Sequence, residues 1–168
     1  DKDGNPLTDK DGEPVNITLT PSSDGLTWTG KIPPNVDGEV KVEVPATDAK
    51  GEPTYTDTTG NPGTPNEATT PVDTLPPTVK IEISPNGDIK VTFDPDVDPS
   101  TIDPNTDIVI TDKDGNPLKD KDGNPVTVPP LSTTDGGITW TGKIPSNVES
   151  EVVVKVPAGS YEDKAGNP

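Results

Sequence analysis

Short runs of alternating hydrophobic and polar residues constrain the fold of this 168-residue chain most strongly. Val79, Ile81 and Ile83 alternate with charged residues, and similar runs occupy 89–93 and 152–156. A period of two is typical of β-strands that bury one face. Clusters of Gly, Pro, Asn and Asp separate the runs, and 23 prolines leave little room for helices. The pattern predicts an all-β protein.

Composition raises disorder as an alternative and narrows the function classes. Only 26% of the residues are hydrophobic and the net charge is −17, as in many disordered chains, but the regular alternation decides against disorder. The lack of Cys and His excludes zinc, haem and iron–sulfur sites, disulfides and Ser-His-Asp catalysis. An acidic chain without Arg is a poor partner for nucleic acid, and no apolar run predicts membrane insertion. Residues 1–4 do not begin a signal peptide, so we expect any export signal outside this chain.

Internal repetition predicts two related domains. Residues 1–7 recur as 112–118, and 26–33 recur as 138–145. The following pairs also match: 40–46 with 152–158, and 55–62 with 161–168. A period of about 110 residues is too long for a solenoid repeat and suits tandem β-sandwich domains.

Strands can be placed within each copy. They are expected at 78–84, 88–94, 107–111, 138–144 and 151–157 of the second copy and at 66–74 of the first. Asp-Gly turns at 114–115 and 122–123 predict a short ribbon that ends at 125–128. The sequence Leu75-Pro76-Pro77 predicts a stiff hinge, because proline fixes φ.

Two motifs together carry a family resemblance. The loop Tyr-x-Asp-x-x-Gly-Asn-Pro at 161–168 and the junction Asp-Thr-Leu-Pro-Pro at 73–77 resemble the bacterial Ig-like repeats of giant surface adhesins. These include the extender regions of RTX adhesins and biofilm-associated proteins, and the resemblance covers essentially the whole chain. It implies tandem Ig-like β-sandwich domains joined end to end by a short Pro-rich junction. It also implies an extracellular rod or filament on the bacterial cell surface, with calcium at its joints. The doubled Asp-Lys-Asp-Gly ribbon departs from the family pattern.

Comparison of the two copies sets the expected domain content. Residues 1–74 match the C-terminal part of an Ig-like repeat without its strands A–C, and residues 75–168 match a repeat without its final strand G. Neighbouring identical repeats, in the same chain or in adjacent subunits, are the expected partners. Such repeats would supply the absent strands, because open strand edges otherwise pair or aggregate. Residues 1–168 alone are therefore expected to be unstable or to self-associate.

Acidic loops suggest a calcium site. In a sandwich with this strand order, the loop after the second strand and the loop after the sixth lie at one end. Carboxylates that converge there would repel one another unless a hard cation lay among them. The predicted Ca²⁺ ligands are Asp73, Asp94, Asp96, Asp98 and Asp163, with Asp57 in the place of Asp163 in the first copy. The alternative is that these are solvated acidic loops.

The Asp-Lys-Asp-Gly-Asn-Pro segments at 1–6 and 112–117 have the first spacings of a calcium loop. An EF-hand requires Gly at position six and Glu at position twelve, where this chain has Pro and Gly in both copies. The alternative, a solvated hairpin turn, is the favoured interpretation.

The aromatic residues also have two interpretations. Trp28 and Trp140 could stack on sugars if exposed, but a sandwich with so few aromatic residues is expected to bury them in its cores. Tyr55 and Tyr161 are expected to pack under the loop that follows them and to place their hydroxyls on backbone groups.

Three functions remain. The leading hypothesis is a non-enzymatic structural spacer of a cell-surface adhesin, with calcium as structural cofactor. The second is a module that binds carbohydrate or another surface. The third is a hydrolase with a carboxylate pair, which would need one acid kept protonated in an apolar pocket. No Asp or Glu of the sequence lies in an apolar context.

Overall fold

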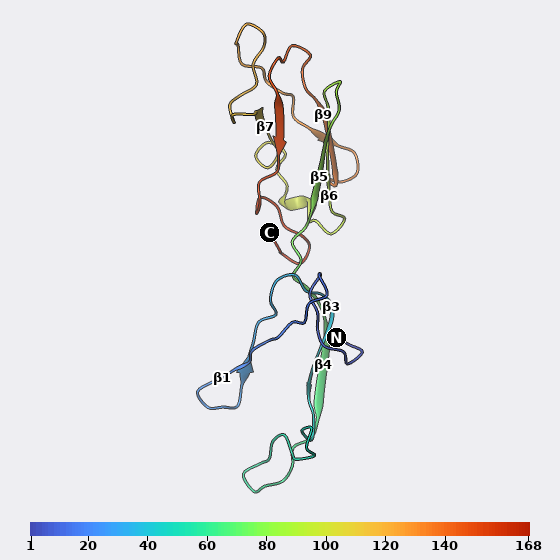
Figure 1. Cartoon of the computed structure of the whole chain (residues 1–168), viewed down its shortest axis with the longest axis vertical. Coiled ribbons are helices and arrows are strands. Elements are labelled where there is room, and N and C mark those ends of the chain that lie inside the picture. The colour runs from blue at the N-terminus through green and yellow to red at the C-terminus, as the bar shows by residue number, and fades with distance from the viewer. The chain divides into compact units, whose positions relative to one another are not determined.

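The computed structural model describes all 168 residues and divides them into two compact units, Asp1–Leu75 and Pro76–Pro168 (Figure 1). Every paired strand is antiparallel, and the chain has one short 3-10 helix, η1 (Pro99–Thr101). The all-β prediction is therefore confirmed.

The second unit contains two small sheets. One has four strands in the order β5-β6-β9-β8, and the other pairs β10 with β7. Their bounds are β5 (Val79–Ile83), β6 (Asp88–Phe93), β7 (Val109–Asp112), β8 (Ser132–Thr133), β9 (Thr139–Lys143) and β10 (Val152–Lys155). The predicted strands all form within a few residues of their expected ends. The chain at 125–128 forms no strand beyond an isolated bridge between Lys119 and Pro125, because two prolines follow at 129 and 130.

The core of the second unit lies between these sheets. Ile89, Val91 and Phe93 come from β6, Val154 comes from β10, and Ile110 of β7 packs against them. Alternate residues of β6 are buried, as the period of two predicts. This arrangement is β-sandwich-like.

The first unit is more open. Its sheets pair β1 (Thr20–Pro21) with β2 (Trp28–Thr29) and β3 (Asp37–Val44) with β4 (Asn66–Asp73). The β3–β4 ribbon is continuous over eight residue pairs, and Figure 1 shows the two strands side by side. Val36 and Val40 are the only buried hydrophobic residues of this unit.

Matching segments of the two units pair in the same register. Thr20 lies opposite Thr29 in the first unit, and Ser132 lies opposite Thr141 in the second. The two hairpins thus have the same pairing register and the same number of residues between the paired positions, although their turn sequences differ.

The tryptophans differ between the units. Trp140 is half-buried against the core and lies opposite Val91, and its Nε1 donates to the carbonyl of Gly137 at 2.8 Å. Trp28 is 57% exposed, so the prediction that it is a core residue is wrong. The reason is that β2 pairs only with β1, whereas β9 is also flanked by β6.

Candidate functional site

Two acidic loops of the second unit lie side by side. Val97 and Asp163 form an antiparallel bridge. The backbone N–H of Asp98 donates to the carbonyl of Glu162 at 2.9 Å, and that of Lys164 donates to the carbonyl of Asp96 at 2.9 Å. These contacts bring together the loops that contain four of the predicted calcium ligands.

The carboxylates in these loops are already hydrogen-bonded. Asp94 accepts from the Thr78 hydroxyl at 3.0 Å and from the backbone N–H of Asp96 at 3.1 Å. Asp98 accepts from the N–H of Ser100 at 2.9 Å and from its hydroxyl at 2.7 Å, and these bonds lower the pKa of Asp98. Asp96 is exposed. No group of three or more carboxylates in the chain is arranged to hold a metal ion, so calcium binding stays a prediction.

Asp163 is the one buried charged side chain, with 4% of its surface exposed. Its carboxylate accepts from the backbone N–H groups of Ala165 and Asn167, both at 2.8 Å, and from the Asn167 side-chain amide at 2.7 Å. Burial acts to raise the pKa of Asp163, but the hydrogen bonds from Asn167 and Ala165 outweigh it and leave the pKa below its ordinary value. The carboxylate is therefore kept ionised.

The same arrangement occurs seven times in the chain. The shared sequence is Asp-x-x-Gly-(Asn/Glu)-Pro, and it begins at Asp1, Asp9, Asp48, Asp57, Asp112, Asp120 and Asp163. In each turn the Asp Oδ1 accepts the N–H groups two and four residues later, at 2.8–3.0 Å.

Each of the seven turns also uses glycine in the same way. The Gly N–H donates to the carbonyl of the Asp at 3.0–3.2 Å. The Gly φ lies between 82° and 88°, a left-handed conformation that favours glycine over residues with a Cβ. The recurring hexapeptide is visible in the sequence, and recognising it would have assigned seven aspartates to turns. The segments at 1–6 and 112–117 accordingly form turns, as the hairpin-turn interpretation predicts.

The two remaining predicted ligands belong to the first unit. Asp57 accepts from Thr59 and Asn61, including the Asn61 side-chain amide at 2.8 Å, and these bonds lower its pKa far below the ordinary value. Asp73 lies at the end of β4, where its carboxylate accepts the N–H of Leu75 at 3.0 Å.

Both tyrosine hydroxyls bind backbone carbonyls, as predicted. Tyr55 Oη donates to Thr64 at 2.6 Å, and Tyr161 Oη donates to Pro77 at 3.3 Å. The Tyr161 ring is buried against Phe93 in an edge-on contact, with ring centroids 4.9 Å apart.

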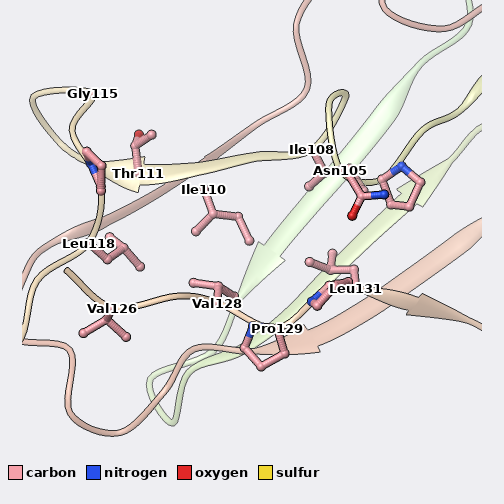
Figure 2. Close-up of a pocket in the computed structure, with 13 residues that line it drawn as sticks. Asn105, Ile108, Ile110, Thr111, Gly115, Leu118, Val126, Val128, Pro129 and Leu131 are labelled. Carbon is pink, nitrogen blue, oxygen red and sulfur yellow. The ribbon is translucent and has the colours of Figure 1, made fainter.

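A cavity of about 370 Å³ opens between β7 and the segment 117–131. Figure 2 shows the side chains of Ile110, Leu118, Val128 and Leu131 around this space. The lining includes the polar side chains of Asn105 and Thr111 but no charged residue. Such a cavity could make apolar contacts with a ligand, but its lining contains no pair of residues for acid–base catalysis.

The comparisons with known proteins gave no relatives. No family model matches the chain, and neither the curated proteins nor the solved structures contain a match. No helix of the chain has the length and apolar character that a membrane span requires.

Proposed function

We propose that this chain is a structural spacer built from tandem Ig-like β-sandwich repeats of an extracellular bacterial adhesin or filament. The observation that carries the proposal is the strand order of the second unit. In chain order, β5, β6, β7, β8, β9 and β10 correspond to strands A to F. The two sheets then have the orders A-B-E-D and C-F, which match the constant-type Ig sandwich apart from strand G.

Repetition supports a spacer over a binding tip. The hairpin at 20–29 keeps its pairing register at 132–141, and the same Asp-x-x-Gly turn recurs in both units. A shaft gains length from equivalent units, whereas a binding site needs a distinct set of residues. The repeated segments contain no such distinct set, and their residues serve structural roles.

The chemistry of the acids argues against a hydrolase. A general acid needs a raised pKa, yet the pKa of Asp163, the one buried acid, is lowered. The apolar cavity beside β7 has no carboxylate in its lining. Neither place supports a carboxylate pair.

Calcium is the proposed stiffening ion. What supports it is the contact between the two acidic loops at Val97 and Asp163, together with the net charge of −17. Calcium binding there would require Asp94, Asp98 or Asp163 to exchange a hydrogen bond for the ion.

Particle length tests the spacer function. Polypeptides with one, two and three tandem copies of residues 1–168 are measured by small-angle X-ray scattering. A spacer is expected to lengthen by the same increment for each copy. A maximum dimension that grows with about the square root of copy number would indicate a flexible coil and contradict the proposal.

A carbohydrate- or surface-binding module is the second candidate, and the exposed aromatic side chains of the first unit favour it. Trp28 is 57% exposed and Tyr55 is 47% exposed. Glycan-array binding that is lost in Trp28→Ala and kept in Trp140→Phe would support this candidate. A silent array is the result expected for a spacer.

A further inference from the structure

The strand β10 has one open edge. It pairs with β7 and with no strand on its other side. Its sequence and that of the residues after it, 152–158, match 40–46 of β3 and its continuation. In the first unit β3 pairs with β4 over eight positions, so the chain itself shows a partner on a matching strand.

Hydrogen-bond directions place β4 on the edge of β3 that corresponds to the open edge of β10. The N–H of Thr74 donates to the carbonyl of Val36, so every second residue of β3 from Val36, including Val40, directs its backbone groups toward β4. The N–H of Asp112 donates to Asn116, away from β10. Its partner Val152, which matches Val40, therefore directs its backbone groups away from β7.

We propose that the open edge of β10 is the receptor for a strand of the β4 type, supplied by another repeat of the same kind. The inference deepens the proposed spacer function, and rests on it, by naming the edge through which repeats join. The strand runs antiparallel to β10 in the register that β4 has on β3. Thr70 of the incoming strand then lies opposite Val152, and Ala68 lies opposite Val154.

Side-chain burial fits this register. Val152, Val154 and Val156 all contact the core of the second unit. Residues directly opposite each other in a sheet share a face, so Thr70 and Ala68 of the incoming strand, opposite Val152 and Val154, would cover that core. Pro71 lies at a position of β4 whose backbone points away from β3, which is where a strand tolerates proline.

Charge also favours the incoming strand on β10. On β3, Glu43 lies directly opposite Glu67, and Lys41 bridges the two at 3.2 and 2.6 Å. The residue of β10 that matches Glu43 is Lys155, which is exposed. Glu67 of a β4-type strand would therefore face an opposite charge on β10, and opposite charges across strands stabilise a pair.

A cavity beside this edge fits the residues that lead into the strand. In the first unit, Gly63 and Thr64 lie against Tyr55, whose hydroxyl binds the Thr64 carbonyl at 2.6 Å. The matching Tyr161 lines a cavity of about 370 Å³ together with Val79, Val156 and Pro168. The Gly-Thr segment that precedes a β4-type strand would occupy this cavity.

Binding of a synthetic peptide with the sequence 62–74 to the full chain tests the proposal. We expect saturable binding that slows hydrogen exchange of the Val152, Val154 and Val156 amides by about tenfold or more. The matched control peptide carries Ala68→Pro and Thr70→Pro, which remove the two N–H groups that face β10. This control should not protect the three amides.

A charge reversal tests the register. Glu67→Lys in the peptide should weaken binding to the native chain by about two- to fivefold, and Lys155→Glu in the chain should restore it. Lys113→Glu, on an exposed turn, is the control that should not restore it. Fusion of residues 63–74 after Pro168 should raise the thermal midpoint of the second unit by about 5 °C or more.

Three results would overturn the inference: no protection at 152–156, protection confined to the first unit, or equal binding of the control peptide. These results would leave the scattering test of the spacer untouched, because a rod can form through other contacts. Conversely, the peptide could bind while the scattering profile is that of a flexible coil. This result would support β10 as the receptor edge and contradict the spacer function.

Discussion

The side chain of Asp163 holds Asn167 by two hydrogen bonds, one to the backbone N–H at 2.8 Å and one to the side-chain amide at 2.7 Å. Asp163 is buried, so its charge depends on these donors and on the N–H of Ala165. The same Asp-to-Asn relationship recurs at Asp57 and Asn61, where both residues are exposed. The turns at Asp163 and Asp57 therefore allow a buried and an exposed copy of the same turn to be compared.

Replacement of Asp163 should destabilise the second unit. Asp163→Ala leaves the N–H groups of Ala165 and Asn167 without their acceptor, and we expect a loss of about 1–3 kcal/mol in the free energy of unfolding. Hydrogen exchange of core amides of the second unit measures this loss. Asp57→Ala, the exposed counterpart, should have a smaller effect on the first unit. Equal effects at both positions would show that burial of Asp163 does not matter.

Acid should weaken the second unit through Asp163. The pKa of Asp163 is lowered by folding, so the folded form binds fewer protons than the unfolded form at the same pH. The resulting stability is fully present above the ordinary pKa of 3.8 and is lost as the pH falls through the lower folded value. The difference between the thermal midpoints of the native chain and Asp163→Asn should be largest above pH 3.8 and should shrink as the pH falls below that value. A difference that is constant from pH 7 to pH 2 would contradict this prediction.

Gly63 should not tolerate a larger residue. A Cβ on Gly63 would lie 2.0 Å from the Tyr55 ring. Gly63→Ala should therefore displace Tyr55, break its bond to the Thr64 carbonyl and destabilise the loop before β4 by about 1–3 kcal/mol. Amide exchange in β4 reports the loss. In a Tyr55→Ala background the clash is absent, so a second loss of the same size on adding Gly63→Ala would disprove the contact.

The two tryptophans should respond differently to a quencher. Trp28 is 57% exposed, whereas Trp140 is half-buried and bonded to Gly137. In Trp140→Phe the remaining fluorescence should be quenched readily by acrylamide, and in Trp28→Phe it should be protected. Similar quenching constants for the two variants would show that the first unit is covered in solution, as expected if the chain self-associates.

Calcium should raise the thermal midpoint of the chain at about 10⁻⁴–10⁻³ M, the range of extracellular modules. Combined Asp73→Asn and Asp163→Asn substitutions should remove most of this effect, whereas Asp9→Asn, in another turn, should not. Magnesium at the same concentration controls for screening of the −17 charge. Identical melting and scattering with EDTA or calcium would mean that these carboxylates serve only as hydrogen-bond acceptors.

Local features of the fold were predictable from the sequence because they depend on neighbouring residues. The alternation at 79–83 and 89–93 predicted β5 and β6, and the Asp-Gly turns were placed correctly. The hydroxyl contacts of Tyr55 and Tyr161 also followed from their place in the repeat.

Features that depend on distant segments were decided by tertiary structure. Trp28 and Trp140 have nearly the same sequence neighbours, yet only Trp140 is covered, because β6 lies beside β9 and no strand occupies that place beside β2. The predicted calcium ligands show the same limit. Sequence placed acidic loops at one end of the sandwich, but hydrogen-bond geometry set the direction of each carboxylate, and that of Asp163 is directed to the N–H groups of its own turn. A pattern of residue types specifies which face of a strand can be buried, whereas only the folded chain specifies what buries it.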